Sequence, residues 1–377
     1  MGTSLSTPGF SRSIRAVSGT LSRWFPRPRT LLPPAAGVDI SDASVKWIVL
    51  EETEHGTSIT SYGHESLPAG IVENGIVKDV SALGEVLAEL KAKMRVDCAH
   101  AALPEESAYV FNMHVPEGSS REQVRSMIEF ELEDRVPIAP TAAVYDFEII
   151  LQHDDGIGEE VGVVVFPREL AESYAAAFAE AGINLLSLEL EASSIARAVS
   201  GRGDDEPITL LVDFGSLRTG ISVLKRGVPI FTSTVAVGGG AIDSAIAKKL
   251  SLTPEEVEAF KNEQGLLAKG GKASPGVEAV TGTASALADE VARHFHYWDT
   301  RRNEHGERVT PVEQVFLIGG AANLKGLADY IAARVQVEVI RPNVWRHVCS
   351  FDECIPQINR RTSLQYATAI GLALRGV

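Results

Sequence analysis

The sequence predicts an α/β protein built from two related lobes, and three observations support this prediction. The stretch GVDISDASVK at 37–46 ends a short apolar strand on an aspartate, which small polar residues and a lysine follow. The stretch LVDFGSLRTG at 211–220 repeats that design in the second half of the chain. Elements with strand-like and helix-like hydrophobic periods alternate along the sequence. The 377 residues also exceed what one ordinary hydrophobic core holds, which favours two lobes.

The first half opens with strands and then alternates between strands and helices. Residues of β-branched and aromatic type predict strands at 45–52 and 57–67, and a 3.6-residue period predicts a helix at 80–94. A βαββα unit follows within residues 97–185. Its expected elements span 107–115, 120–136, 145–151, 162–166 and 168–182. A strand at 185–190 and a following helix return to the first lobe, so the unit is expected to be an insertion.

The second half follows a polar, glycine-containing joint at 201–207, which marks the boundary between the halves. The strand, aspartate turn and strand recur at 208–224, and a helical region follows at 241–300. The expected remainder is a strand at 312–320, a helix at 324–335, a strand at 338–340 and a final helix at 363–377.

The two aspartate turns are suited to holding a triphosphate. A turn of small residues between strands presents backbone N–H groups to phosphate oxygens. An acid at the strand end can face Mg²⁺ through the ion's water shell, because Mg²⁺ dehydrates reluctantly. We therefore expect Asp39 and Asp213 to face one magnesium ion between the lobes, with Lys46 or Arg218 offsetting phosphate charge. A single aspartate of this kind more often only starts a turn, but the pair favours the clamp.

Two glycine-rich segments extend this expected site. In VFLIGGAANLKGL, Gly319 and Gly320 follow a strand pattern and let the backbone approach a flat ligand. In VAVGGGAIDSAIAKKLSLTPEEVEAFK, three glycines precede a helix, and Glu258 and Lys261 share a later helical face within reach of a ribose or base. The alternative for this Glu–Lys pair is an ordinary solvated helix surface.

The net charge of −15 argues against nucleic acid as a general partner, since phosphate contact needs a basic face. Residues 1–36, however, contain five arginines and no acid. Apolar residues within 14–25 fall at helical spacing between the arginines. This leader is either an amphipathic segment for an anionic membrane surface or a disordered extension. No apolar run reaches the roughly 18 residues that a membrane-spanning helix needs.

The three cysteines, Cys98, Cys349 and Cys354, are too few for a disulfide framework, so the sequence favours a reducing compartment. The spacing of His347, Cys349 and Cys354 fits no common zinc pattern, and no fourth ligand is evident. We expect idle or buried thiols there rather than a metal centre.

Several motifs, in their order along the chain, resemble those of the actin-like ATPase superfamily. They are GVDISDASVK, LELEASSIARA, LLVDFGSLRTGISVL, VAVGGGAIDSAIAKKLSLTPEEVEAFK, FLIGGAANLKGLADYI and YATAIGLALRG. Within the superfamily the chain is most similar to the PilM family, an FtsA relative and the cytoplasmic actin-like component of the type IV pilus inner-membrane platform. The resemblance covers about residues 36–377, and the βαββα unit resembles the family's subdomain 1C.

The resemblance implies an actin-like two-lobed fold of duplicated ribonuclease H-like subdomains with an FtsA-type inserted 1C subdomain. The expected boundaries are 1–36 for the leader; 37–96, 186–206 and 355–377 for subdomain 1A; 97–185 for subdomain 1C; 207–238 and 312–354 for subdomain 2A; and 239–311 for subdomain 2B.

The resemblance also implies ATP and Mg²⁺ as ligands. Asp39 and Asp213 would face the metal, and Glu191 would orient the attacking water, with a helix-start acid favoured by the helix dipole as the alternative for Glu191. The first phosphate turn would comprise Gly37, Ser41, Asp42 and Lys46; the second, Gly215, Arg218 and Thr219; the ribose side, Gly238, Gly239, Glu258 and Lys261; and the adenosine side, Gly319, Gly320, Ala321 and Asn323.

Three positions depart from the family pattern. Ser41 stands at a usual glycine, Asp42 at a common hydroxyl residue, and Ala321 at the third glycine of the adenosine loop. A carboxylate at position 42 repels phosphate unless it turns outward or meets magnesium. We therefore expect nucleotide binding to be kept and ATP hydrolysis to be slow or absent.

The resemblance implies a scaffold, cytoplasmic and peripheral at the inner membrane, that captures the N-terminal peptide of a single-span, PilN-like membrane protein. The groove between the first lobe and the inserted unit is the expected peptide site. Further expected partners are pilus motor ATPases, other copies of the chain, and the membrane surface, reached through the partner and residues 1–36. The alternatives are an actin-superfamily enzyme with real turnover, such as a sugar kinase, an FtsA-like component, or a type II secretion component. The inserted unit and the lack of a recognisable sugar-binding motif favour the scaffold.

Overall fold

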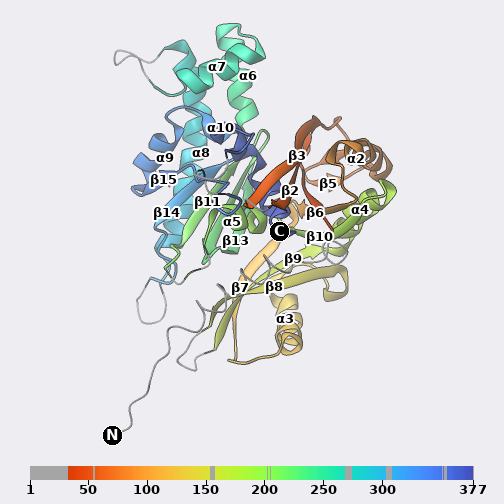
Figure 1. Ribbon diagram of the computed structural model, residues 1–377. Helices are drawn as coiled ribbons and strands as arrows, with labels where there is room; N and C mark the ends of the chain where they lie inside the picture. Colours follow the sequence, from red (N-terminus) through yellow and green to blue (C-terminus); the bar gives the residue numbers. More distant parts are fainter. Residues whose placement is uncertain are drawn as a thin grey trace.

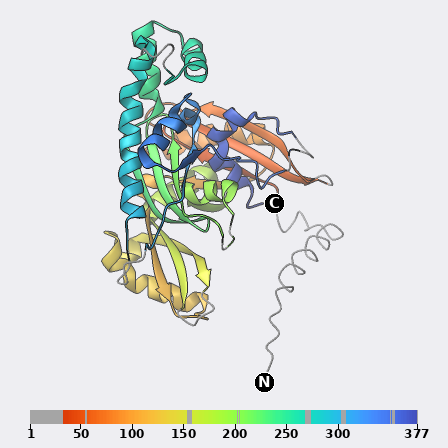
Figure 2. The ribbon, with the colours of Figure 1, turned by 90° about the vertical axis from the view of Figure 1, so that its left-hand side faces the viewer.

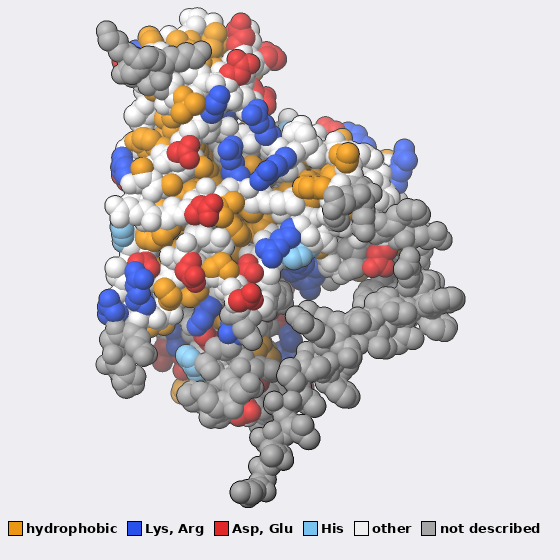
Figure 3. All heavy atoms as spheres, turned by 60° about the vertical axis from the view of Figure 1, so that its left-hand side comes forward, with side chains coloured by type: hydrophobic (Ala, Val, Ile, Leu, Met, Phe, Trp, Pro, Cys, Tyr) orange, Lys and Arg blue, Asp and Glu red, His pale blue; other side chains and the backbone are white. Residues whose placement is uncertain are grey.

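The computed structural model describes residues 33–53, 56–152, 158–201, 203, 205–267, 274–302, 308–349, 351 and 355–376 (Figure 1). Most of the basic leader and Cys354 lie outside these residues. The described chain forms two α/β lobes with a smaller sheet-and-helix unit below them (Figure 2). The face in Figure 3 carries both acidic and basic side chains, with hydrophobic ones between them. Within the described part of the chain, no helix is both long and apolar enough to cross a membrane.

The first lobe contains a five-stranded mixed sheet. In order across the sheet, its strands are β10 (Asn184–Leu190), β6 (Cys98–Leu103), β1 (Ala35–Ile40), β2 (Ser44–Thr53) and β3 (Gly56–Ser66). β1, β2 and β3 pair antiparallel, whereas β6 runs parallel to both β1 and β10. All six residues of β1 are buried because the strand lies in the middle of the sheet. The end of β1 therefore carries Asp39 into the interior.

Helices of the first lobe pack on this sheet and on one another. They are α2 (Val80–Met94), α4 (Arg168–Glu180), α5 (Glu191–Val199), and α11 (Ala367–Ala373), which α10 (Arg360–Ser363) and the 3₁₀ turn η5 (Leu364–Tyr366) precede. α2 begins at Asp79, whose side chain accepts a hydrogen bond from the N–H of Ala82. Its buried Leu83, Leu87 and Leu90 follow the helical period that predicted it. α11 contacts β1, β2, β6 and α5, and all seven of its residues are buried.

The second lobe repeats the strand order of the first. Its sheet runs β13 (Val228–Val235), β12 (Thr219–Lys225), β11 (Thr209–Phe214), β14 (Gln314–Ile318) and β15 (Glu338–Ile340). β11, β12 and β13 pair antiparallel, and β14 runs parallel to β11 and β15. This order and these directions match β3, β2, β1, β6 and β10 of the first lobe. The lobes are therefore related, as the repeated aspartate turn predicted.

The region predicted as helical at 241–300 contains three separate helices. The helices of this lobe are α6 (Gly239–Leu250), α7 (Pro254–Glu263), α8 (Pro275–Asp299) and α9 (Leu327–Val335), with the 3₁₀ turn η4 (Gly320–Asn323) between β14 and α9. α7 starts at a capping box in which Thr253 and Glu256 each accept a hydrogen bond from the backbone of the other. α8 packs against both α6 and α9.

The smaller unit has its own sheet and its own hydrophobic core. Its strands lie in the order β7 (Tyr109–Val115), β9 (Glu159–Pro167) and β8 (Ala143–Gln152), all antiparallel, and its helix is α3 (Arg121–Arg135), followed by the 3₁₀ turn η2 (Pro140–Ala142). Val124, Ile128 and Leu132 of α3 form its core together with Val161 and Val163 of β9. The unit lies at the end of the molecule away from α6 and α7 (Figure 2).

β6 and α4 pack with the first lobe, although their residues fall within the 97–185 range expected for the inserted subdomain. β6 pairs with β1, and α4 packs against α2. The sequence CAHAAL was not predicted as a strand, because alanine has weak β propensity and a fully buried strand shows no alternation. β6 ends just before Pro104 and so places Glu105 and Glu106 of the 3₁₀ turn η1 (Glu105–Ser107) between the lobes.

Candidate functional site

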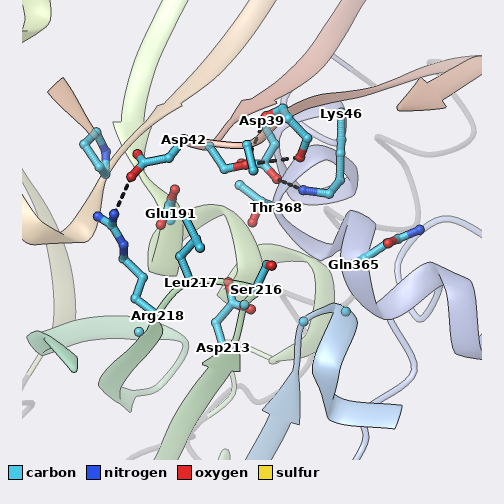
Figure 4. A pocket seen from close by; sticks show the side chains of 18 of the residues that line it. Asp39, Asp42, Lys46, Glu191, Asp213, Ser216, Leu217, Arg218, Gln365 and Thr368 are labelled. Atoms are coloured by element: carbon cyan, nitrogen blue, oxygen red, sulfur yellow. Dashed lines mark hydrogen bonds and ion pairs between the residues drawn. The ribbon is translucent and has the colours of Figure 1, made fainter. Parts of the chain in front are cut away.

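A cleft of about 400 Å³ lies between the two lobes. Its walls come from the β1–β2 turn, the β11–β12 turn, the segment after β6, the start of α5, the turn after β14 and the segment that leads into α11 (Figure 4). Among the residues predicted for the site, the cleft brings together Asp39, Ser41, Asp42, Lys46, Glu191, Asp213, Gly215, Arg218, Gly319 and Gly320. Segments far apart in the sequence therefore meet at one place.

The strand register sets the surroundings of Asp39. Asp39 lies directly opposite Lys46 in the antiparallel pair of β1 and β2, and Lys46 Nζ is 3.4 Å from Asp39 Oδ2. Ser41 closes the turn between these strands, since its N–H donates to Ser44 O at 2.8 Å and its hydroxyl donates to the same oxygen at 3.0 Å. The turn thus holds a carboxylate and an ammonium together at the cleft.

Asp213 occupies the equivalent place in the second lobe but has no cation opposite. Its cross-strand neighbour in β12 is Gly220. Desolvation, and then the charge of Asp39, raise the pKa of Asp213 to about 6. Desolvation followed by Asp39 also raises the pKa of Glu191, at the start of α5, well above its ordinary value. For the buried Glu105, desolvation and then Asp213 raise the pKa to about 8.

This group of carboxylates fits a magnesium ion held through water. Desolvation is the larger cause of these raised pKa values and neighbouring carboxylates add to it, so a divalent cation between the lobes would stabilise the ionised forms. In the described part of the chain, no three acidic, histidine or cysteine side chains are close enough to hold a metal together. Mg²⁺ commonly keeps several of its waters, so a small number of carboxylates facing the water shell suffices. Asp39 and Asp213, which were predicted to face the ion, both line the cleft.

Asp42 and Arg218 form a bridge between the lobes. Arg218 donates to Asp42 and to Glu106, and a longer bond of 3.3 Å reaches Asn74 Oδ1. Asp42 also accepts two bonds of 2.9 Å from the N–H groups of Asn74 and Gly75. Both residues were expected to meet phosphate, whereas here they meet each other (Figure 4). The carboxylate of Asp42 points toward Arg218 and away from Asp39, but it still belongs to the lining of the cleft.

A tight hairpin holds the other end of that bridge. Asn74 and Gly75 join β4 (Val72–Glu73) to β5 (Ile76–Val77), and both have positive φ, of 52° and 71°. The buried hydroxyl of Tyr174 in α4 donates to Gly75 O at 2.9 Å. The turn is therefore fixed to the first lobe, and its N–H groups point to Asp42.

Gly319 needs to be glycine because of Asp213. Its φ is 91°, and a Cβ atom there would lie 2.5 Å from Asp213 Oδ1. The N–H of Gly319 donates to Leu364 O at 3.2 Å, which joins the end of β14 to the segment before α11. The missing side chain thus lets the end of β14 pass directly beside the cleft aspartate.

Gly37 and Thr219 do not line the cleft, and packing explains both. A Cβ atom on Gly37 would lie 2.0 Å from Ala369 O, so glycine allows α11 to approach β1. Thr219 is buried and its hydroxyl donates to Val237 O at 2.6 Å, which ties β12 to the segment before α6. Their expected contact with phosphate is not what the structure gives them.

Gly238, Gly239 and Ala321 also lie outside the cleft lining. A Cβ atom on Gly238 would lie 2.3 Å from Ser216 O, and one on Gly239 would lie 2.3 Å from Ala321 Cβ. The N–H of Gly239 donates to Gly215 O at 2.9 Å. The start of α6 is thus packed on the β11–β12 turn and supports that turn from behind.

Glu258, Lys261 and Asn323 line a second pocket, of about 370 Å³, that continues from the cleft. Gly320 and Gln365 line both pockets. The ribose and adenosine sides stay a prediction for this second pocket. Within the second pocket, Lys261 Nζ lies 2.6 Å from Asp243 Oδ1, and Asn323 Nδ2 donates to Arg361 O at 2.9 Å.

Several cleft residues were not predicted from the sequence, above all Glu105, Glu106 and His64. Glu105 Oε1 accepts a bond of 3.1 Å from Ser222 of β12, a second contact between the lobes. Burial, and then Lys46, lower the pKa of His64, so this side chain is neutral at pH 7. The available signal was Pro104, which directly follows an apolar run and so indicates the end of a strand. Glu105 and Glu106 come directly after it.

A separate groove of about 420 Å³ lies where the inserted unit meets both lobes. β8 and β10, each at the edge of its own sheet, contribute to it, and β9 and β13 contribute further residues. Phe147, Val164 and Leu188 give it an apolar lining. Glu189 stands at its charged end, where it accepts bonds from Arg197 at 2.6 and 2.7 Å and from Arg375.

A family model described as type IV pilus assembly protein PilM matches residues 37–377 of this chain. The chain is similar to a solved structure of a PilM–PilN type IV pilus biogenesis complex, with a TM-score of 0.73 and 21% identity over 92% of this chain and 99% of that one. It is also similar to ethanolamine utilization protein EutJ from Carboxydothermus hydrogenoformans, with a TM-score of 0.51 and 18% identity over 91% and 89%. At these identities the similarities concern the fold, and the predicted actin-like two-lobed fold is confirmed.

Proposed function

Because the chain belongs to the PilM family of type IV pilus assembly proteins, we propose that it is a nucleotide-binding scaffold of the pilus machinery. It binds ATP with Mg²⁺ between the lobes and captures the cytoplasmic N-terminal peptide of a PilN-like membrane protein in the separate groove. The observation that carries the first half is the meeting of two related strand–turn–strand units, each with an aspartate at the strand end, across one cleft.

The residues of the cleft divide the work of holding a magnesium-bound nucleotide. A bound Mg²⁺ would offset the negative charge of the cleft carboxylates, and Asp39 and Asp213 would hold its water shell. Lys46 pairs with Asp39 across the β1–β2 strand pair and brings a positive charge to the phosphate side of the cleft. Gly319 and Gly320 leave room for the nucleotide where the cleft joins the pocket of Glu258.

The apolar groove supports the second half of the proposal. Two strand edges and an apolar floor suit an extended peptide, which can add main-chain hydrogen bonds to an edge and place alternate side chains in the floor. The solved relative described as a PilM–PilN complex supports a partner of that kind. The partner, and in part residues 1–36, would hold the chain at the cytoplasmic face of the inner membrane, with motor ATPases and other copies as further partners.

Nucleotide binding is tested by the melting temperature with and without Mg–ATP. A ligand at about 100 times its Kd stabilises the folded state by about 2.7 kcal/mol, so wild type should melt at a higher temperature with Mg–ATP. Asp213→Asn keeps the size of the side chain and removes its charge, and it should abolish the shift. Glu338→Gln, which changes an exposed carboxylate on edge strand β15, is the control and should keep the shift. An equal shift in wild type and Asp213→Asn would rule out the clamp.

Peptide capture is tested by calorimetric titration with the cytoplasmic N-terminal peptide of a PilN-like membrane protein. Leu188→Arg puts a charge into the groove and should weaken binding at least about tenfold. Leu186→Arg lies on the same strand, where Leu186 is 41% exposed and outside the groove lining, and should bind as wild type does. Equal binding by both variants would move the peptide site elsewhere.

Turnover of ATP is the second candidate function, and Glu191 is the observation that favours it. Its carboxyl lines the cleft and has a raised pKa, as a general base or water-orienting group would. With Asp42 and Arg218 held by each other, we expect hydrolysis well below about 1 per second. A faster steady-state rate that Glu191→Gln removes would favour the enzyme over the scaffold.

A further inference from the structure

The bridge between the lobes lies at one end of the cleft. Asp42 of the β1–β2 turn and Arg218 of the β11–β12 turn meet there, and Gln365 lies at the opposite end (Figure 4). The pocket of Glu258 and Lys261 continues from the Gln365 end. A nucleotide whose base occupies that pocket would run its phosphates from Gly320 past the two aspartates, and its last phosphate would arrive at the bridge.

The two partners of the bridge are not equally fixed. Asp42 accepts the N–H groups of Asn74 and Gly75 at 2.9 Å, and this turn is in turn bonded to Tyr174. The backbone O of Arg218 accepts from the N–H of Gly215, but its guanidinium lies at the end of a long side chain, where it donates to Asp42, Glu106 and Asn74. A phosphate that reached this end would therefore have to draw Arg218 away from a carboxylate that stays in place.

The charges of the cleft make a third phosphate costly. Its described lining includes the acidic side chains Asp39, Asp42 and Glu106, three buried ones with raised pKa (Glu105, Glu191 and Asp213), and only two cationic side chains, Lys46 and Arg218. Both cations are already paired with carboxylates. One magnesium ion offsets part of this charge, but each added phosphate brings more negative charge toward Asp42. The bridge also lies at the end of the cleft that such a phosphate would reach.

Resting on the proposed nucleotide site, we propose that the bridge of Asp42, Arg218 and Glu106 sets how many phosphates the cleft accepts. The closed bridge favours a magnesium-bound nucleoside diphosphate over the triphosphate. The triphosphate binds only when Arg218 leaves Asp42 and turns to the third phosphate. Opening of the bridge also removes the Arg218 tie between the lobes, so the number of phosphates controls how firmly the lobes are joined.

The experiment is a calorimetric comparison of Mg–ADP with Mg–AMPPNP, a triphosphate analogue that resists hydrolysis. For wild type we expect the Kd of the triphosphate to exceed that of the diphosphate about tenfold, as one unfavourable charge contact in a partly buried site would produce. Asp42→Asn removes the fixed negative charge and leaves Arg218 with Glu106 and Asn74 as its partners. The ratio of the triphosphate Kd to the diphosphate Kd should then fall to about one. Arg218→Gln leaves Asp42 charged and without its cation, so the ratio should rise.

The Kd ratio is expected to change in opposite directions in Asp42→Asn and Arg218→Gln. This distinguishes the proposed role from a general loosening of the fold, which would change the ratio in the same direction in both variants. Glu106→Gln, which weakens one side of the bridge, should lower the ratio less than Asp42→Asn does. Glu73→Gln removes an exposed carboxylate on β4, beside the same turn, and should leave the ratio unchanged. Melting curves without nucleotide check that each variant folds.

Each outcome decides the proposal. A wild type that prefers the triphosphate, an unchanged ratio in Asp42→Asn, or equal changes in Asp42→Asn and Arg218→Gln would overturn the role of the bridge while leaving the nucleotide site in place. A wild type that binds neither nucleotide would overturn the nucleotide site itself, and the bridge with it.

Discussion

Asp39 and Asp213 have equivalent positions in the two lobes but different electrostatic surroundings. The register of β1 and β2 puts Lys46 opposite Asp39, whereas the register of β11 and β12 puts Gly220 opposite Asp213. The second lobe therefore brings a carboxylate without a cross-strand cation to the cleft, where desolvation, and then the charge of Asp39, raise its pKa to about 6. One residue across a strand pair thus decides which of the two aspartates most needs an added cation.

At the residue scale, Glu105 gives a pH prediction. Burial raises its pKa from the ordinary 4.5 to about 8, so the folded state binds the proton more tightly than the unfolded chain. Its contribution to stability is therefore fully present below about pH 4.5 and is lost as the pH rises through about 8. Glu105→Gln should remove this loss, which is on the order of a few kcal/mol.

The measurement is the melting temperature of both proteins, without nucleotide, from pH 5 to pH 9. The wild-type curve should fall more steeply, so that the advantage of Glu105→Gln grows with pH. Asp213 titrates in the lower part of this range and its charge adds to the raised pKa of Glu105, so the two proteins are compared above about pH 7. Parallel curves would show that Glu105 is charged in the folded state at neutral pH.

At the scale of elements, the approach of α11 to β1 fixes the floor of the first lobe. All residues of both elements are buried, and they contact each other directly. Gly37 was predicted as a phosphate-turn residue, and the structure instead puts it under Ala369. Its role in the cleft is indirect, because it sets how close the helix lies to the strand that carries Asp39.

Gly37→Ala should lower the free energy of unfolding by about 1–3 kcal/mol or more, because the new methyl group would lie 2.0 Å from Ala369 O and the helix must move. The matched control is Gly282→Ala in α8, where nothing lies within 4 Å of the new Cβ atom. That change should raise stability by up to about 1 kcal/mol through helix propensity. Denaturant unfolding measures both. A neutral Gly37→Ala would contradict the close packing.

At the scale of the whole molecule, the inserted unit and the two lobes leave two separate sites. The cleft lies between the lobes, and the apolar groove lies where the inserted unit joins them. Leu190, the last residue of β10, lines the groove, and Glu191, the first of α5, lines the cleft. The groove and the cleft are therefore connected through two adjacent residues of the chain.

The basic leader gives a prediction at this scale. Removal of residues 1–32 leaves β1 intact and should weaken binding to anionic vesicles, because each arginine near such a surface contributes about 1 kcal/mol. High salt should remove that contribution. With the PilN-like partner in the vesicles, the shortened chain should still co-sediment at high salt, since a peptide in an apolar groove depends less on charge. The shortened chain that also carries Leu188→Arg is the control, and with the same vesicles it should stay in solution.

Complete loss of association by the shortened chain, with the partner present, would make the leader the anchor.

The sequence alone predicted most of the helices and strands, and it predicted both aspartate turns. The period of α2, the capping of its start at Asp79 and the repeated strand–turn–strand pattern are encoded by neighbouring residues, so they can be recognised without the fold. β6 was missed because its burial, which replaces any alternation, is decided by strands distant in the sequence.

Only the tertiary structure decided which predicted residues meet in the cleft and which residues they pair with. Gly37 and Gly239 were predicted for the nucleotide site, yet each packs against a distant segment. Asp42 and Arg218 come from turns in different lobes, so their contact depends on how the lobes lie against each other. Local hydrophobic period and turn chemistry are written in adjacent residues, whereas the choice of an ionic partner depends on distances in space, which the order of residues along the chain does not give.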